Sequence, residues 1–182
     1  MSENVHITLG VTGGIAAYKA ADLTSKLTSA GLTVHVVMTE SATRLVSPRT
    51  FQTLSRQEVT TSLWEVADWK PEHVELGRIS KLMVIAPCTA NMIAKIAHGI
   101  ADDALSTAVL ANPAPLLLAP AMNPVMWQNP AVQENVEILK KRGVQFAGPV
   151  CGHVACGADG TGRMIEPAEI LEKIFEILNI AK

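Results

Sequence analysis

The sequence predicts an α/β protein, a three-layer sandwich in which helices cover both faces of a parallel sheet. The first observation is a β-rich run at residues 5–11, a glycine turn, a helical segment at 15–30 and a second β run at 33–38. Such a β–α–β unit joins parallel strands by a right-handed crossover. The second is that apolar runs and helical segments alternate as far as residue 147, without internal repeats. This is typical of a Rossmann-like (flavodoxin-like) fold in one domain, residues 1–182.

The first half of the chain has helices with recognisable ends. Ile15, Ala16, Leu23 and Leu27 recur at helical spacing, and Gly31 is placed to end that helix. Further helices are predicted to begin at Thr39, where the second strand ends, and at Ser47, a capping residue that is followed by a proline. The polar, tryptophan-containing segment that follows is predicted to be an excursion from the sheet, residues 58–71.

The second half repeats the alternation. A continuous apolar strand at 82–86 is expected to end at Pro87, because proline cannot donate to a sheet ladder. The other predicted elements are helices at 91–97, 103–111, 130–142 and 167–178, a strand at 115–119 and a weak strand at 145–147. The glycine-rich residues 148–162 show no periodicity, and we expect residues 151–164 to form a mobile flap that can close over a ligand.

Composition narrows the function classes. A net charge of −2 gives no support for nucleic acid or an anionic membrane as a partner. The residues before the first strand lack a basic leader, and no apolar run approaches membrane-spanning length. The three cysteines therefore indicate a reducing cytoplasm. Because 48% of the residues are hydrophobic and only 18% charged, we expect surface to be buried between subunits.

The turn after the first strand is a candidate anion site. Residues 13–15 place glycines at a helix N-terminus, where free N–H groups and the helix dipole favour phosphate. The spacing is not G-x-G-x-x-G, so the dinucleotide fingerprint fails. Thr39 and Ser41 offer hydroxyls that favour a mononucleotide, although Glu40 between them leaves a ribose diol open. The alternative is a turn whose glycines serve only tight packing.

Two further strand ends are small and polar. Residues 89–92 follow the third strand, where ordinary helix capping is the alternative. In the stretch 118–127 a buried strand stops at Pro120, and Asn123, two methionines and a tryptophan follow. Because loops diverge where parallel strands end, this stretch predicts a pocket wall. The alternative is that Asn123 caps a short helix with Pro124 in its first turn.

Several histidines and cysteines have more than one possible role. Cys88 is interpreted as a small buried hydrophobe. A histidine side chain ordinarily has a pKa near neutral pH, so His73 could act as an acid or base, or be structural. Cys151, His153 and Cys156 lack a fourth ligand and match no common zinc spacing, so we predict no metal. A thiol with an ordinary pKa near ~8.5 is mostly protonated at neutral pH, so Cys156 could be a proton donor.

The chain resembles the homo-oligomeric flavin-containing cysteine decarboxylases over nearly its whole length. The markers are Gly13-Gly14-Ile15-Ala16-Ala17-Tyr18-Lys19, His73-Val74-Glu75-Leu76, Pro120-Ala121-Met122-Asn123-Pro124-Val125-Met126-Trp127, and Ala155-Cys156-Gly157 leading to Gly162-Arg163-Met164. The P-x-M-N-x-x-M-W pattern is highly specific. One departure is visible, since Ala158 stands where the family often has Asp, and Asp159 follows.

The resemblance implies an FMN-dependent carboxy-lyase that converts 4'-phosphopantothenoylcysteine to 4'-phosphopantetheine in coenzyme A biosynthesis. It implies FMN contacts from Gly13, Gly14, Ile15, Thr39, Ser41, Thr89, Ala90, Asn91, Met92 and Ala121. It implies that His73 is the base, that Cys156 is the proton donor and that Asn123 grips the substrate. Further substrate contacts are expected from Met126, Ala155, Gly157 and Arg163.

The resemblance also implies a homo-oligomer built of trimers, up to a dodecamer, with the active site between subunits. Bifunctional relatives continue into a synthetase domain, so we expect either a stand-alone enzyme or the N-terminal part of such a chain. Alternatives are a lantibiotic-type peptidyl-cysteine oxidative decarboxylase, a flavin prenyltransferase of similar fold and a non-catalytic regulatory flavoprotein. The presence of Cys156 argues against the first, and His73, Asn123 and Cys156 together argue against the last.

Overall fold

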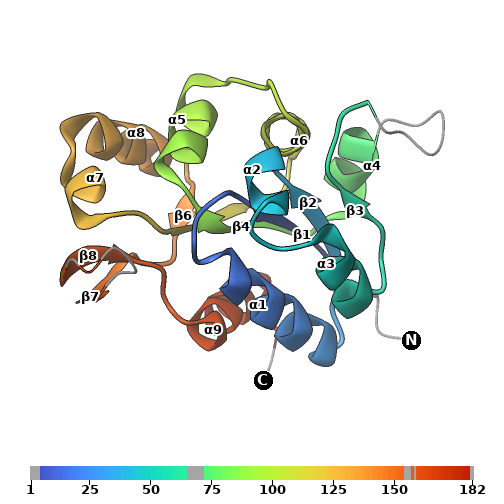
Figure 1. Cartoon of the computed structure of the whole chain (residues 1–182). Coiled ribbons are helices and arrows are strands. Elements are labelled where there is room, and N and C mark those ends of the chain that lie inside the picture. The colour runs from blue at the N-terminus through green and yellow to red at the C-terminus, as the bar shows by residue number, and fades with distance from the viewer. Residues whose placement is uncertain (1–4, 65–71, 154–156, 158, 181–182) are drawn as a thin grey trace.

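The chain folds around a six-stranded parallel sheet with the strand order β3-β2-β1-β4-β5-β6 (Figure 1). The computed structural model describes residues 5–64, 72–153, 157 and 159–180, with the backbone alone for 72–74. The strands are β1 (His6–Val11), β2 (Thr33–Met38), β3 (Val59–Thr60), β4 (Leu82–Cys88), β5 (Leu116–Pro120) and β6 (Gln145–Phe146). The predicted parallel α/β sheet is confirmed.

Helices cover both faces of the sheet, as predicted (Figure 1). One face carries α1 (Ala17–Ser29), α3 (Pro48–Ser55) and α9 (Pro167–Leu178), and the other carries α4 (Glu72–Ile79), α5 (Ala90–His98), α6 (Ala104–Ala111) and α8 (Pro130–Lys141). The short helices α2 (Glu40–Thr43) and α7 (Pro124–Gln128) follow β2 and β5 directly. Within the described residues, no helix is both long and apolar enough to cross a bilayer.

The centre of the sheet is buried on both faces, and its strands β2, β4 and β5 carry apolar side chains at most positions. In β4, which is buried throughout, Leu82 and Val84 belong to the cluster that includes α1 and α9. Met83 and Ile85 belong to the cluster on the opposite face, with α5, α6 and α8. Alternate residues of a strand point to opposite faces, so this pattern fixes the strand between two layers. The polar chemistry is left to the loops at the strand ends.

Two predicted boundaries around the sheet were wrong. β4 does not end before Pro87 but continues to Cys88, with a register shift between Ile85 and Cys88 in its pairing with β5. A proline is tolerated inside a sheet at such an irregularity, because the ladder hydrogen bond is already interrupted there. The predicted excursion at 58–71 begins with Val59–Thr60, which pair with β2 as an edge strand.

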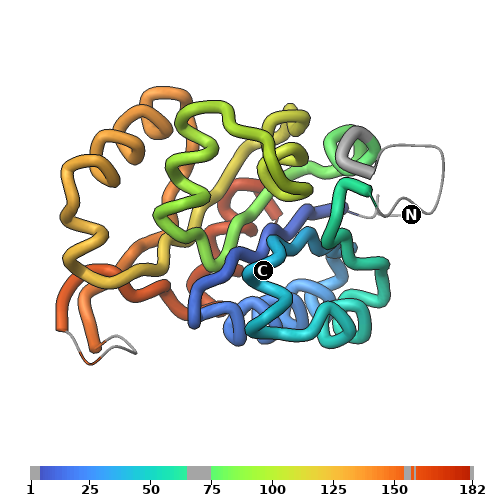
Figure 2. Tube along the Cα trace, turned by 45° about the horizontal axis from the view of Figure 1, so that its top comes forward, coloured from blue at the N-terminus to red at the C-terminus, as the bar shows by residue number. Residues whose placement is uncertain are grey.

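The prediction for the glycine-rich flap did not include its two strands. Its described residues form an antiparallel ribbon of β7 (Val150–His153) and β8 (Asp159–Arg163). Strand β8 packs against α7, and Figure 2 shows the ribbon beside the segment that leaves β5. The ribbon therefore stands at the carboxyl edge of the sheet, next to the predicted pocket wall.

Candidate functional site

Three neighbouring strands bring their carboxyl ends together at the middle of the sheet. Thr12, directly after β1, donates its hydroxyl to the carbonyl oxygen of Pro87 at 2.7 Å and accepts the N–H of Thr89 at 3.1 Å. A Cβ on Gly13 would lie 2.3 Å from the Cβ of Ser41, so only glycine permits this approach to the residues that follow β2. The ends of β1, β2 and β4 are thereby held as one surface.

Hydroxyl caps start the helices that follow these strands. The Thr39 hydroxyl accepts the N–H of Ala42 at 3.3 Å, and the Thr89 hydroxyl accepts the N–H of Met92 at 3.4 Å. Both threonines therefore cap a helix, which was the alternative considered for residues 89–92. The caps also fix the backbone at the rim of a cleft, so capping and ligand contact are compatible at these positions.

The cleft consists of two joined cavities at this edge. The first has a volume of about 600 Å³ and the second a volume of about 470 Å³. Both are lined by Gly13, Thr89, Ala90 and Met126, and these four shared residues are called the neck. Each of the ten predicted cofactor residues lines at least one cavity: Gly13, Gly14, Ile15, Thr39, Ser41, Thr89, Ala90, Asn91, Met92 and Ala121.

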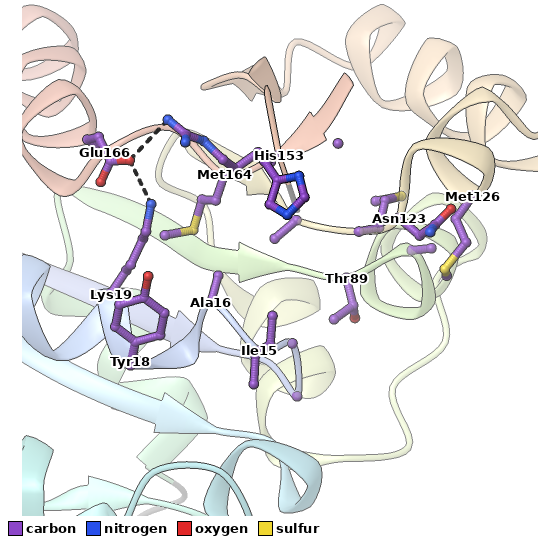
Figure 3. A pocket seen from close by; sticks show the side chains of 17 residues that line it. Ile15, Ala16, Tyr18, Lys19, Thr89, Asn123, Met126, His153, Met164 and Glu166 are labelled. Atoms are coloured by element: carbon purple, nitrogen blue, oxygen red, sulfur yellow. Dashed lines mark hydrogen bonds and ion pairs between the residues drawn. The ribbon is translucent and has the colours of Figure 1, made fainter. Parts of the chain in front are cut away.

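Asn123 fits both of its predicted readings. Its side-chain oxygen accepts the N–H of Val125 at 2.8 Å and so caps α7, and the residue also lines the first cavity. Met126 lies one turn later and is about half exposed at the neck. Figure 3 shows the two side chains at the same end of the cleft.

The ribbon supplies one wall of the first cavity. His153, Gly162, Arg163 and Met164 line it, although sequence reasoning predicted Arg163 alone of these four as a contact. The carbonyl oxygen of Gly162 accepts the N–H of Met122 at 2.9 Å. A Cβ on Gly162 would lie 2.3 Å from the carbonyl oxygen of Met122, so the ribbon meets the loop after β5 through backbone alone.

The remaining predicted site residues are not among the described residues that line the cleft. Gly157 is exposed and is not among the described residues that line either cavity. Ala155 and Cys156 lie outside the described residues, and so does the side chain of His73, whose backbone belongs to α4. Their predicted roles remain predictions.

Sequence reasoning missed an ion-pair group in the first cavity. Lys19 donates to the Glu166 carboxylate at 2.8 Å, and Arg163 donates to the same carboxylate oxygen at 3.3 Å (Figure 3). The Lys19 side chain is only 13% exposed. Lys19 belongs to one of the family markers, but Glu166 lies 147 positions away, so no local pattern indicated the pair.

Among the described residues that line the second cavity, acidic side chains outnumber basic ones. The Lys95 ammonium lies 2.6 Å from the carboxylates of both Asp102 and Asp103. Burial opposes the charge of Lys95, but the hydrogen bonds and charges of the two aspartates outweigh it and raise the pKa of Lys95. The hydrogen bond from Lys95 lowers the pKa of Asp102. Glu40, which also lines this cavity, forms an ion pair with Arg44 one turn along its own helix.

The structure bears on the predictions for Cys88 and for a metal site only within the described residues. Cys88 is fully buried, and this burial raises the pKa of its thiol, as expected of a small hydrophobe that takes no part in proton transfer. Across residues 5–64, 72–153, 157 and 159–180, no three histidine, cysteine or carboxylate side chains gather as a metal site would require.

Glycines and capped helix starts at three strand ends, with a two-part cleft between them, define an α/β protein that binds a nucleotide-like cofactor. The family can be stated more closely. A family model described as Flavoprotein matches residues 1–179, and the chain belongs to this family.

Curated relatives are similar over nearly the whole of this chain. It is 48% identical over 175 residues to the coenzyme A biosynthesis bifunctional protein CoaBC of Bacillus subtilis, covering 94% of this chain and 43% of the relative. It is 44% identical over 167 residues to the CoaBC protein of Escherichia coli K12, covering 91% and 41%. The chain therefore spans less than half the length of these relatives.

Solved structures share the fold over their whole length. A cysteine-to-serine mutant of PPC decarboxylase complexed with pantothenoylaminoethenethiol matches with a TM-score of 0.86 and 30% identity, covering 97% of this chain and 100% of that one. The FMN-dependent cysteine decarboxylase SpaF matches with a TM-score of 0.82 and 31% identity, covering 98% of each chain. The FMN-binding protein AtHal3 matches with a TM-score of 0.83 and 28% identity, covering 99% and 100%.

Proposed function

We propose that this chain binds FMN and decarboxylates 4'-phosphopantothenoylcysteine to 4'-phosphopantetheine in coenzyme A biosynthesis. The observation that carries the proposal is a cleft lined by all ten predicted cofactor residues and by Asn123, in a chain 48% identical to a coenzyme A biosynthesis protein. Similarity to a PPC decarboxylase along the whole of that chain supports the same substrate class.

The residues of the cleft fit a flavin mononucleotide. Gly13 leaves no room for a side chain between the first turn and Ser41, so backbone N–H groups can approach a phosphate there. Thr39 and Ser41 add hydroxyls in the second cavity, and Asn91 adds an amide. Across the neck, Ala121 and the small residues of the first turn leave space for a flat ring.

The proposed chemistry answers a specific difficulty. A cysteine-derived carboxylate has no electron sink for the carbanion that remains when CO2 leaves. Bound flavin supplies two-electron oxidation of the carbon next to sulfur and the return of those electrons after CO2 loss. The protein supplies position and protons: Asn123 orients the carboxylate, His73 accepts a proton, and Cys156 donates one to the enethiol product.

Assembly and location extend the proposal. We infer a homo-oligomer built of trimers, up to a dodecamer, in the cytoplasm. Large exposed apolar side chains support burial by a second subunit, since Ile15 and Tyr18 at the first cavity and Val125 in α7 are each more than 60% exposed. The chain would act either alone or as the N-terminal domain of a longer, bifunctional protein.

The lantibiotic-type peptidyl-cysteine reaction is the second candidate. It is favoured less, because the peptidyl-cysteine decarboxylase EpiD is 22% identical to this chain, whereas the CoaBC relatives reach 48% and 44%. The two candidates differ in product, since the peptide enzymes release the enethiol and the proposed enzyme reduces it.

One assay tests the function and separates the candidates. Protein reconstituted with FMN is incubated with 4'-phosphopantothenoylcysteine, and CO2 and the thiol product are followed by mass spectrometry. Release of CO2 with fully reduced 4'-phosphopantetheine is expected. A protein that takes up no FMN, or that releases no CO2 while binding it, contradicts the proposal.

A cysteine variant tests the last step. We expect Cys156→Ser to bind FMN normally and to accumulate oxidised enethiol, because the proton donor for its reduction is missing. The absorbance of the flavin and the mass of the product are measured together. Fully reduced product at the wild-type rate would remove Cys156 from the mechanism.

A further inference from the structure

The first cavity ends in a compact ion-pair group. Lys19 from α1 and Arg163 from β8 both donate to one oxygen of Glu166, the residue that precedes α9. Lys19 is mostly buried, whereas Arg163 and Glu166 are close to half exposed. Figure 3 shows Lys19 and Glu166 at the opposite end of the cleft from Asn123 and Met126.

This group has an excess of positive charge. Two cations share one carboxylate, which leaves a net charge of +1. In the second cavity Lys95 faces the carboxylates of Asp102 and Asp103, and Glu40 adds a third carboxylate to the lining, so the balance there is negative. No other lysine or arginine among the described residues lines either cavity. A dianionic group that enters in addition to the phosphate of the cofactor is therefore attracted to the Lys19 end of the first cavity.

We propose that Lys19 and Arg163 form the subsite for the phosphate group of the substrate, with Glu166 as its resident counter-ion. This inference rests on the proposed function, whose substrate carries a carboxylate at one end and a phosphate at the other. Asn123 would orient the carboxylate end, and the distant cations would take the phosphate. Arginine forms paired hydrogen bonds to phosphate oxygens, and a shielded ammonium adds a fixed charge.

The Glu166 carboxylate would make the subsite select phosphorylated over dephosphorylated compounds. Without phosphate, its carboxylate holds both cations in place and balances the charge of the shielded Lys19. A bound phosphate offers the same cations more oxygens and more charge than one carboxylate, whereas a dephosphorylated analogue offers none. Phosphate would also connect α1 to β8, so the charged end of the substrate would help to hold the ribbon against the cleft.

The test compares kcat/KM for 4'-phosphopantothenoylcysteine and for pantothenoylcysteine. Wild-type protein is expected to prefer the phosphorylated compound. Lys19→Met and Arg163→Met are each expected to reduce that preference by about 10-fold or more, the value of one charge-assisted hydrogen bond. Lys19→Arg is expected to restore most of it, and Glu166→Gln is expected to keep or increase it.

Matched controls separate the possible failures. Lys26→Met removes an ion-paired lysine from the same helix outside the cavities and should leave the preference unchanged. Flavin absorbance and thermal unfolding verify that each variant is folded and loaded. An unchanged preference in both Lys19→Met and Arg163→Met overturns the subsite while the proposed function stands. Absence of CO2 from both compounds with wild-type protein overturns the proposed function, and the subsite with it.

Discussion

The two edges of the same sheet use their polar side chains in opposite ways. Towards the amino ends of the strands, His6 Nδ1 lies 3.0 Å from His35 Nε2 with the rings stacked, and buried Thr8 and Ser80 share a 2.6 Å hydrogen bond. At the carboxyl edge, Thr12 bonds backbone atoms of a neighbouring strand end and shapes a cleft. Polar groups that satisfy one another contribute to stability, and those that organise backbone around a cavity make a site.

The largest effect is expected where the ribbon meets the carboxyl edge. Gly162→Ala would place a Cβ 2.3 Å from the carbonyl oxygen of Met122 and displace the loop that carries Asn123. We expect kcat/KM to fall on the order of 100-fold, because a small misplacement of a positioning group is costly. Flavin absorbance should persist.

Gly152→Ala is the matched control on the same ribbon. Its Cβ would lie 3.5 Å from Arg163 Nε, an ordinary contact, so a much smaller loss is expected. Equal losses in the two variants would show that the ribbon tolerates no alanine and that the contact with Met122 has no special part.

The next effect concerns the turn after β1. Gly13→Ala would bring its Cβ to 2.3 Å from Ser41 Cβ, and we expect FMN affinity to fall about 10- to 100-fold from overpacking. In Gly14→Ala the nearest atom is Thr89 Cγ2 at 3.5 Å, so the loss should be smaller. Fluorescence titration of FMN ranks the variants, and the reverse order would contradict the close-approach argument.

A smaller effect is expected for the link between strand ends. Thr12→Val leaves the Pro87 carbonyl and the Thr89 N–H without their partner and should destabilise the fold by about 1–3 kcal/mol. Thr24→Val is the control, because that buried hydroxyl donates within its own helix to Ala20. Urea unfolding measures both, and equal values would mean that the Thr12 link has no special weight.

The smallest effect concerns the opposite edge. Burial and then the charge of His6 lower the pKa of His35, so the unfolded chain takes up a proton at higher pH than the folded chain. Stability should therefore be full above the ordinary histidine value, fall as the pH drops below it, and level off below the folded pKa. Urea unfolding at pH 7.5 and 5.5 checks this, and His35→Gln should weaken the dependence.

The sequence was informative where local chemistry decides structure. The apolar runs of β1, β2 and β4 predicted a buried parallel sheet, and the small polar residues after each strand predicted where the cleft would open. Helix α9 was predicted with its observed limits, because a proline start and a regular apolar repeat mark it. The family resemblance is confirmed by the match over residues 1–179.

Tertiary contacts decided the rest. Strands β7 and β8 are rich in glycine, which has low strand preference, and they form where Gly162 fits against Met122. Pro87 continues β4 because the ladder is irregular there. The Lys19–Glu166 pair joins residues 147 positions apart, and no spacing rule reaches that far.

The neck between the two cavities has a consequence for inhibitor design. Gly13 and Ala90 present almost bare backbone there, and Thr89 is committed to its helix. Met126 is the long, unbranched side chain of the set, and a thioether adapts its shape readily. A compound that occupies both cavities would therefore contact rigid groups at Gly13, Thr89 and Ala90 and one adaptable side chain at Met126. Larger substituents should be added on the side that faces Met126.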